Sequence, residues 1–235
     1  MDKVALITGG RSGIGLACAQ KLSQSGYEVV TAQRTPADTF HSIEADFSDP
    51  DTPKRVIQQV IDRHGRLDAL VNNAGIAILK TLPELSLADY NRQMLVNMTS
   101  VFLGTQKAVA LMRETGVKGS IINMSSVAAL VGVPACSAYA AAKGGVIGFT
   151  KTIAAETAAE GIRCNTIHPG LIDTNMQRQS SVDNPEEYVK LNAAVPMGYM
   201  GPPHTIADAA LFLVSDLSTY MTGAQMVIDG GLINQ

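Results

Sequence analysis

The chain has 235 residues, 46% hydrophobic and 17% charged, so it carries enough apolar side chains for a folded core and is not expected to be disordered. Its formal net charge of −3 gives no reason to expect nucleic acid or an anionic membrane as a partner. No apolar run approaches the roughly 18 residues of a membrane span and no secretory signal is visible, so we expect a cytoplasmic protein that forms one domain over residues 1–235.

Short apolar runs alternate with segments of helical spacing along the chain. The runs rich in branched residues are 4–7, 29–30, 69–71, 121–124, 164–167 and 226–228. Continuous hydrophobicity is typical of strands covered on both faces, and the spacing of Ile14, Cys18 and Leu22 predicts a helix after the first of them. Gly26 and Gly65 fall where the first two helices are expected to end. The alternation predicts an α/β fold, a Rossmann-like doubly wound parallel sheet with helices on both faces.

The first expected strand runs into a glycine-rich turn with the spacing G-x-x-x-G-x-G, which then opens a helix. Such a turn lets the backbone approach a pyrophosphate closely, and it aims the positive end of the helix at that negative charge. The turn is therefore predicted to bind a dinucleotide cofactor. Its predicted cofactor-binding residues are Gly9, Arg11, Ser12, Gly13, Ile14 and Gly15.

The second expected strand, 28–34, ends without an acidic residue. NAD-binding proteins usually place a carboxylate there for the ribose hydroxyls, whereas this chain has Gln33 followed by Arg34. A guanidinium at Arg34, helped by Arg11, can bind the 2′-phosphate of NADP, so NADP is predicted over NAD. Asp46, after the expected third strand, can accept a hydrogen bond from the adenine amino group. The connection between Arg34 and that strand is too short for a helix.

Polar residues follow the next strands. Asn72-Asn73-Ala74-Gly75 ends the fourth strand, the pair Ser125-Ser126 ends the fifth, and Tyr139 and Lys143 stand on the next helix. Residues four apart share a helix face, and an ammonium beside a phenol lowers the phenol pKa. Tyr139 is therefore predicted to act as an acid or base near neutral pH, with a serine hydroxyl holding a carbonyl or alcohol oxygen against it.

In this order the motifs resemble the short-chain dehydrogenase/reductase family over essentially the whole chain. The resemblance implies that Tyr139 is the general acid in reduction and the base in oxidation, and that Lys143 binds the nicotinamide ribose. It selects Ser126 over Ser125 to orient the substrate oxygen, and it gives Asn97, inside the helix after the fourth strand, a water in a proton relay. The matching positions are Thr8, Gly9, Gly13, Gly15, Asn72–Gly75, Asn97, Ser126, Tyr139, Lys143 and Pro169-Gly170.

The same resemblance implies further contacts. The cofactor is expected along Asn73, Ala74 and Gly75, along Tyr139 and Lys143, and at Pro169, Gly170, Ile172 and Thr174. The substrate is expected against Ser126, Cys136, Tyr139 and Met176, although Cys136 can equally pack as a small apolar residue. The irregular segment 175–203 is expected to form a substrate lid. Related enzymes pair the helices 86–114 and 137–160 between subunits, which predicts a homotetramer.

Other polar residues are set aside. The three cysteines form no Cys-x-x-Cys pair, and His41, His64, His168 and His204 lack partners at metal-ligand spacing, so no metal is predicted and the histidines are interpreted as surface or structural. Glu156 and Glu160 are interpreted as a solvated face. Glu160 also stands where carrier-protein reductases are expected to have an arginine, so an acidic carrier would be repelled there.

The leading hypothesis is an NADP(H)-dependent oxidoreductase that interconverts a small, mostly neutral carbonyl compound and its alcohol by hydride transfer. One alternative is an enzyme like 3-oxoacyl-[acyl-carrier-protein] reductase. Another is a non-catalytic NADP-binding regulatory protein, against which the intact Ser126, Tyr139 and Lys143 argue. An epimerase or dehydratase is disfavoured by the glycine spacing.

Overall fold

The predicted sheet is present in the computed structural model, which describes residues 2–174 and 185–234. In these residues seven strands, all parallel, form one sheet in the order β3-β2-β1-β4-β5-β6-β7. The strands are β1 (Val4–Thr8), β2 (Glu28–Gln33), β3 (His41–Glu44), β4 (Ala69–Asn72), β5 (Ser120–Met124), β6 (Arg163–Pro169) and β7 (Gln225–Ile228). The chain builds outward from β1 to β3, returns to β4 and builds in the other direction, which is the doubly wound order predicted.

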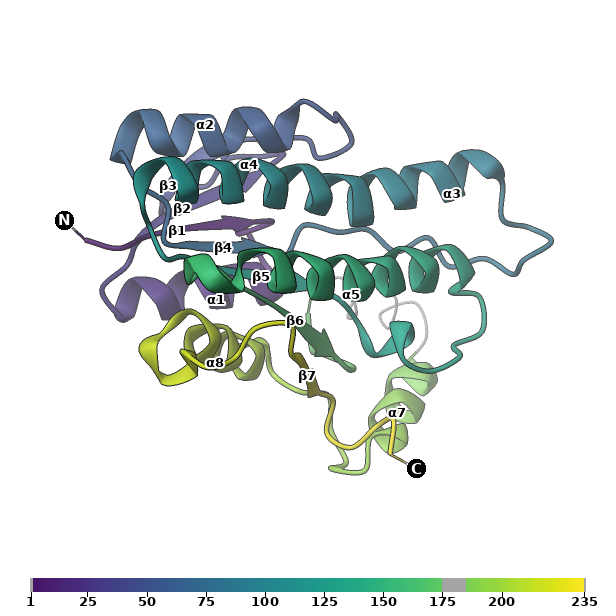
Figure 1. The fold of residues 1–235 in the computed structure, drawn as a ribbon. Coiled ribbons are helices and arrows are strands. Elements are labelled where there is room, and N and C mark those ends of the chain that lie inside the picture. The colour runs from purple at the N-terminus through teal and green to yellow at the C-terminus, as the bar shows by residue number, and fades with distance from the viewer. Residues whose placement is uncertain (1, 175–184, 235) are drawn as a thin grey trace.

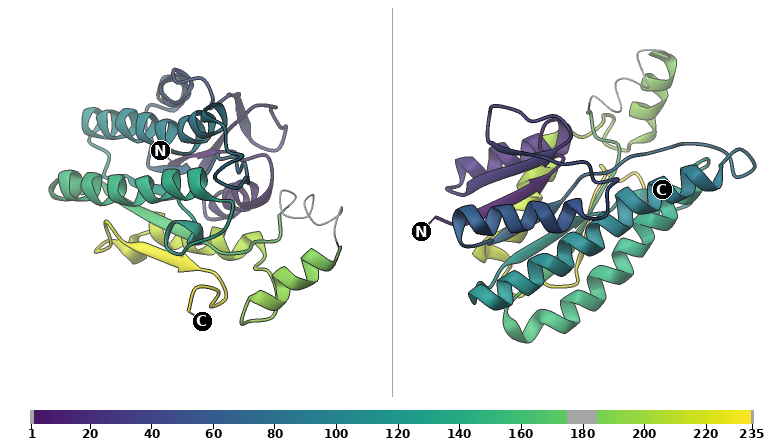
Figure 2. Two further views of the ribbon diagram at one scale, coloured as in Figure 1. Left: turned by 90° about the vertical axis from the view of Figure 1, so that its right-hand side faces the viewer. Right: turned by 90° about the horizontal axis from the view of Figure 1, so that it is seen from above.

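Helices cover both faces of the sheet, as Figures 1 and 2 show. One face carries α2 (Thr52–His64), α4 (Ser100–Thr115) and α5 (Ser137–Thr157), and the other carries α1 (Gly13–Gln24) and α8 (Pro203–Val214). The helix α3 (Leu87–Met94) continues into α4 through one π-helical turn, Leu95–Thr99, whereas the sequence predicted an uninterrupted helix. The helix α7 (Pro185–Ala194) stands away from the sheet.

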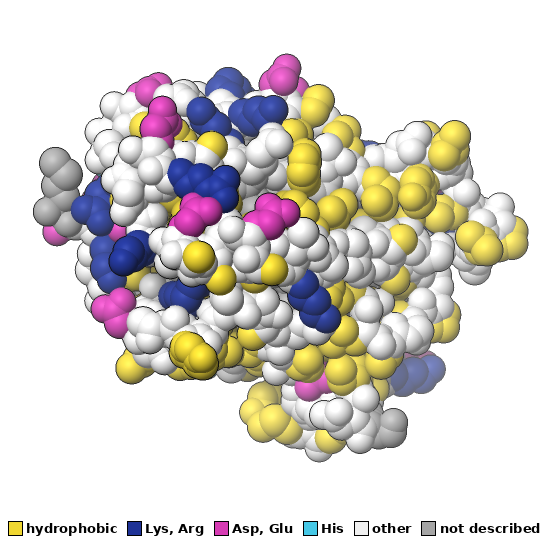
Figure 3. All heavy atoms as spheres, in the orientation of Figure 1, with side chains coloured by type: hydrophobic (Ala, Val, Ile, Leu, Met, Phe, Trp, Pro, Cys, Tyr) yellow, Lys and Arg dark blue, Asp and Glu magenta, His cyan; other side chains and the backbone are white. Residues whose placement is uncertain are grey.

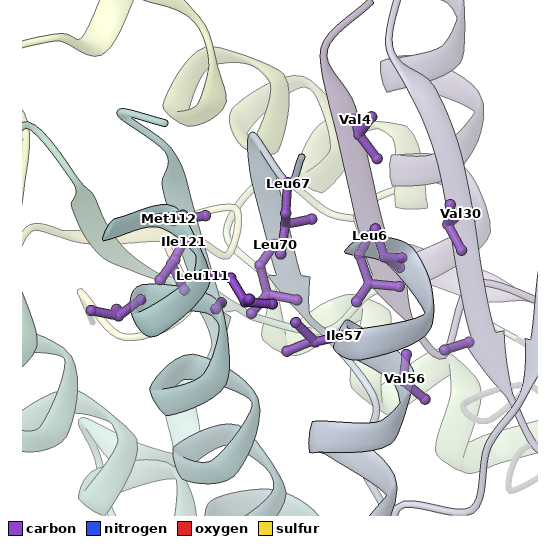
Figure 4. Packing of buried hydrophobic residues seen from close by; sticks show 14 of the residues in the cluster. Val4, Leu6, Val30, Val56, Ile57, Leu67, Leu70, Leu111, Met112 and Ile121 are labelled. Carbon is purple, nitrogen blue, oxygen red and sulfur yellow. The ribbon is translucent and has the colours of Figure 1, made fainter. Parts of the chain in front are cut away.

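The core lies in two layers because successive strand residues point to opposite faces. In β1, Val4 and Leu6 join the cluster under α2, α4 and α5, whereas Ala5 and Ile7 join the cluster against α1 and α8. Figure 4 shows Leu6 beside Leu70 and Ile57 in the first cluster. Burial on both faces explains the continuous apolar runs of the sequence.

The predicted ends of elements are confirmed at two glycines. Gly65 caps α2 in the left-handed conformation, and Gly26, also with positive φ, follows the end of α1. Residues 34–40 contain no helix, as their number implied. One element was not predicted: the segment expected to be irregular, 175–203, contains α7, where Leu191, Ala193 and Ala194 favour a helix.

Candidate active site

The predicted site residues come together at the carboxyl end of the sheet, which is the right-hand end of the strands in Figure 1. The glycine-rich turn follows β1, residues 73–75 follow β4, residues 125–126 follow β5 and residues 170–174 follow β6. In a parallel sheet all these loops open at the same end, on either side of the point where the strand order reverses. Residues far apart in the sequence therefore form one site.

The glycine-rich turn has the geometry of a phosphate-binding loop. Gly9 and Gly13 adopt φ of 70° and 56°, which other residues rarely adopt. A Cβ on Gly15 would lie 2.2 Å from the carbonyl oxygen of Gly9, so no side chain fits there. Ser12 precedes α1 without a capping hydrogen bond from its side chain, which leaves the first amides of the helix, from Gly13 to Gly15, available to an anion.

Thr8 and Asn73 hold this turn against the end of β4. The Thr8 hydroxyl accepts hydrogen bonds from the backbone amides of Asn73 at 3.0 Å and Ala74 at 2.9 Å. The Asn73 side-chain amide donates to the Thr8 carbonyl at 2.9 Å. On the other side, a Cβ on Gly13 would lie 3.2 Å from Cγ2 of Thr174, so the loop after β6 also reaches the turn. The structure thus brings the turn, Asn73, Ala74 and Thr174 together.

The loop after β6 begins where expected. Pro169 is the last residue of β6, and the Gly170 amide donates to the Ile228 carbonyl at 2.9 Å. Ile172 is buried and bridges to Gly201. Met176, the remaining predicted substrate residue, lies outside the described residues, as does the part of the predicted lid from 175 to 184.

Residues at the end of β2 frame the expected adenosine end of the site. Gln33 is buried, and its Nε2 donates to the hydroxyls of Thr31 and Ser42. Arg34 and Arg11 are exposed, and neither pairs with an acidic residue in the described part of the chain. Hydrogen bonds from the amide and hydroxyl of Ser48 hold the pKa of Asp46 below its usual value, with a smaller contribution from the charge of Arg34. Arg34 and Asp46 therefore lie on the same side of the site.

Ser126, Tyr139 and Lys143 meet where α5 crosses the end of β5. Nζ of Lys143 donates to the Met124 carbonyl at 2.8 Å and lies 5.9 Å from the centre of the Tyr139 ring. The Ser125 hydroxyl donates to the Lys143 carbonyl at 2.9 Å, which fixes α5 to the strand end. The Ser126 side chain lowers the pKa of Tyr139, which places the two side chains near each other, and Oγ of Ser126 accepts from the Ala128 amide at 3.2 Å. The phenol of Tyr139, the hydroxyl of Ser126 and the amine of Lys143 therefore lie near one another.

The pKa of Tyr139 departs from the prediction. Burial raises it, and the hydrogen bond with Ser126 offsets only part of this effect. Lys143, 5.9 Å from the ring centre, is not among the groups that shift it, and burial lowers the pKa of Lys143 itself to about 8. Tyr139 is therefore a protonated phenol at neutral pH, suited to donate a proton.

Asn97 lies in the π-helical turn and is fully buried. Its Nδ2 donates to the Ile76 carbonyl at 2.8 Å, and its Oδ1 accepts from the Ile76 amide at 2.9 Å. Its side chain therefore holds the loop after β4, a contact that the sequence did not predict. A Cβ on Gly75 would lie 3.0 Å from the same Oδ1 and 3.6 Å from Nζ of Lys143, so Gly75 lets the two polar groups approach each other. The water relay through Asn97 stays a prediction.

Cys136 and His168 are both buried. Cys136 is buried directly before α5, and burial raises the pKa of its thiol. It therefore packs as an unreactive, small apolar side chain. Of the two interpretations of His168, surface or structural, the second holds: it is buried in β6 with its ring against the backbone of Ser126. The position of His168 directly before Pro169-Gly170, beside the end of β5, was the sequence feature that could have indicated this contact with Ser126.

Glu160 is exposed, as expected of a solvated face, and it forms a bidentate ion pair with Arg113 at 2.6 and 2.7 Å. Its expected place beside the active site was wrong. It lies beyond the last turn of α5, whereas Tyr139 lies in the first turn. The pairing with Arg113 offsets the negative charge, so repulsion of an acidic carrier at Glu160 is not a sound argument.

The described residues hold no group of three histidine, cysteine or acidic side chains that could bind a metal ion. All three cysteines are free and buried. None of the helices in the described part of the chain is both long enough and apolar enough to cross a membrane.

A phosphate-binding turn at the switch point of a doubly wound sheet, beside a partly buried tyrosine and a buried lysine, defines a dinucleotide-dependent oxidoreductase. A family model described as Enoyl-(Acyl carrier protein) reductase matches residues 9–233. The chain belongs to the short-chain dehydrogenase/reductase family, as its motifs predicted, and is an enzyme of the class that acts on CH–OH groups.

Relatives agree with this assignment. The chain is 36% identical over 243 residues to cyclopentanol dehydrogenase of Comamonas testosteroni, covering 98% of this chain and 96% of the relative. It is 35% identical over 247 residues to the NADP-dependent (R)-specific alcohol dehydrogenase of Lentilactobacillus kefiri, covering 99% and 97%.

Solved structures share the fold. Ligand-free Thermoplasma acidophilum aldohexose dehydrogenase superposes with a TM-score of 0.94 at 31% identity, over 100% of this chain and 95% of that one. ElxO with NADP bound gives 0.93 at 30% identity, over 100% of both chains.

Proposed function

We propose that the chain is an NADP(H)-dependent oxidoreductase that interconverts a small apolar carbonyl compound and its alcohol, with Tyr139 as general acid and base. The observation that carries the proposal is the meeting of Ser126, Tyr139 and Lys143 beside the glycine-rich turn. In reduction, the Tyr139 phenol donates a proton to the carbonyl oxygen while the Ser126 hydroxyl holds that oxygen. In oxidation Tyr139 must first lose its proton, and its phenolate oxygen then accepts the proton of the alcohol.

The residues present fit a nicotinamide cofactor. At Gly15 the turn has no room for a side chain, and the side chain of Ser12 does not cap the first amides of α1. Both features suit a pyrophosphate. The exposed Arg34 and Arg11 would hold a 2′-phosphate, and Asp46 would hold the adenine. The nicotinamide end would lie along Asn73, Ala74, Gly75, Tyr139, Lys143, Pro169, Gly170, Ile172 and Thr174. When bound, the cofactor gives or takes the hydride. The NADP dependence of the Lentilactobacillus relative supports the choice of NADP.

Two loops beside Tyr139 support an apolar substrate. Residues 76–79 read Ile-Ala-Ile-Leu, and residues 127–136 contain no charged side chain. The loops are joined by a hydrogen bond from the Lys80 amide to the Ala135 carbonyl at 3.0 Å. Leu79 is 62% exposed and Val133 41%, and apolar side chains gather on this side of the molecule in Figure 3. Such walls bind hydrocarbon groups better than hydroxyl groups.

We expect secondary alcohols and ketones with apolar groups to be better substrates than sugars. Because each buried methylene contributes about 0.8 kcal/mol, kcat/KM for cyclopentanol should exceed that for an aldohexose by tenfold or more (about 1.4 kcal/mol). Initial rates of cofactor absorbance change with NADP and an alcohol panel measure this. Val133→Thr keeps the side-chain shape but replaces a methyl group by a hydroxyl, so it should reduce the difference in kcat/KM between cyclopentanol and the aldohexose. A preference for the aldohexose, or for a carrier-linked ketoester, would contradict the proposed substrate. If no compound is turned over, the proposed oxidoreductase activity is wrong.

We also propose the homotetramer that the sequence predicted. On the outer surface of α4 and α5, Phe102 and Phe149 pack edge to face at 5.7 Å between ring centres. A Cβ on Gly144 or Gly148 would meet nothing within 4 Å, which supports close approach of helices from another subunit. Light scattering at micromolar concentration should give four times the 24.8 kDa of the chain, and Gly148→Arg should give a smaller species. A monomeric unaltered protein would refute this prediction.

We infer a cytoplasmic location, which three free cysteines support because thiols stay reduced there. Residues 1–235 are proposed to act as one domain, in which 175–203 covers the substrate.

A further inference from the structure

His168 lies between the end of β5 and the end of β7. Its side chain is fully buried, and both ring nitrogens have partners. Nδ1 lies 3.3 Å from the backbone carbonyl oxygen of Ser126, and Nε2 lies 2.8 Å from the Thr166 hydroxyl. The mechanism described above uses none of these contacts.

The partners determine where the proton of the ring sits. A carbonyl oxygen can only accept a hydrogen bond, so Nδ1 must carry the hydrogen and donate it to Ser126. Burial lowers the pKa of His168, which favours the neutral ring. Nε2 then accepts from the hydroxyl of Thr166, which is closer to Nε2, at 2.8 Å, than to its other acceptor, the Ala224 carbonyl, at 3.3 Å. His168 is therefore a neutral ring with one defined tautomer and a donor fixed on the peptide of Ser126.

Three consecutive residues at the end of β5 are each held from outside the strand. The Met124 carbonyl accepts from Lys143 at 2.8 Å, and the Ser125 hydroxyl donates to the Lys143 carbonyl at 2.9 Å. These contacts fix the strand end to α5. The carbonyl of Ser126 accepts from the Ala129 amide at 3.1 Å, within its own turn, and its contact from outside that turn comes from His168 on β6. The peptide plane after Ser126 determines how the chain turns away from the serine.

We propose that His168 is a positioning residue that orients Ser126 through its backbone carbonyl, so that the Ser126 hydroxyl meets the substrate oxygen beside Tyr139. This role rests on the proposed function, in which Ser126 holds that oxygen. A leucine of similar size would fill the space but leave the Ser126 carbonyl with the Ala129 amide alone and the Thr166 hydroxyl with the Ala224 carbonyl alone. A displacement of about 1 Å at a reacting group can cost on the order of a hundredfold in rate.

Two substitutions separate the two ring nitrogens. The amide nitrogen of Asn occupies nearly the position of Nδ1, whereas that of Gln reaches the position of Nε2. His168→Asn should therefore keep kcat for ketone reduction within about threefold, and His168→Gln should lower it by tenfold or more (about 1.4 kcal/mol). Neither variant should change the Kd for NADPH. Equal kcat values for the two variants would overturn the proposal, because a residue that only fills space would not distinguish them.

A double-mutant cycle tests whether His168 acts through Ser126. In a Ser126→Ala protein the further change His168→Gln should have little effect on the remaining rate, and an undiminished effect would overturn the proposal. If His168→Gln fails to fold, the ¹⁵N spectrum of the unaltered protein decides: hydrogen on Nδ1 is expected, and hydrogen on Nε2 alone would overturn it. An unaltered protein without turnover would refute the proposed function and this role together. Normal turnover by His168→Gln would refute this role alone.

Discussion

Replacement of Tyr139 by phenylalanine is expected to lower turnover by at least about a hundredfold, the usual contribution of a positioned proton donor. The ring would keep its place near Lys143, but the hydroxyl that interacts with Ser126 and is proposed to face the substrate oxygen would be lost. Because the phenol pKa is raised by burial, Tyr139 is protonated at neutral pH and is the donor during reduction. Steady-state reduction of a ketone with NADPH measures the loss as a fall in kcat.

The control for this variant is Tyr90→Phe. Tyr90 lies on α3 and is 38% exposed, so its hydroxyl can be removed without reaching the site. Tyr90→Phe should keep normal turnover, and Tyr139→Phe should keep the Kd for NADPH. If Tyr139→Phe itself keeps near-normal turnover, another residue donates the proton and the mechanism proposed here is wrong.

Arg34→Ala should raise the Kd for NADPH by about ten- to a hundredfold, because a hydrogen bond between a guanidinium and a phosphate contributes roughly 1.5–3 kcal/mol. Arg34 follows β2 directly, is exposed and acts on Asp46, so it stands at the proposed adenosine end. NADH has no 2′-phosphate, and its Kd should stay almost unchanged. Titration of cofactor fluorescence measures both constants.

Arg63→Ala is the matched control. Arg63 is an exposed arginine in the last turn of α2, and its charge acts on His41 at the beginning of β3. It therefore lies at the amino end of the strands, and its removal should change neither Kd. Binding of NADH by the unaltered protein as tight as that of NADPH would contradict the cofactor assignment.

The sequence predicted those parts of the site that local pattern determines. Apolar runs and helical spacing determine the sheet, and a parallel sheet places all its carboxyl ends together. Gly9 to Gly15, Asn73, Ser126 and Tyr139 each follow or adjoin such an end. Their convergence was therefore predictable before any distance was known.

What escaped prediction depends on contacts between distant residues. The π-helical turn at Asn97 is paired with Ile76, and Glu160 is paired with Arg113 on another helix. The pKa of Tyr139 depends on burial, and the Lys143 amine is engaged by Met124. Helical spacing and residue type carry no information on such partners, so these features could be found only in the folded chain.

The π-helical turn also limits how the length of the chain can vary. Successive residues of an α-helix are rotated by about 100° around its axis, so the additional residue accommodated in Leu95–Thr99 sets the phase of α3 relative to α4. In Figure 1 the two helices form one continuous rod. Deletion of one residue here would rewind the rod and turn Asn97 away from Ile76. An insertion between β2 and β3, where residues 34–40 form no helix, would rotate nothing, so natural variation in length should concentrate there.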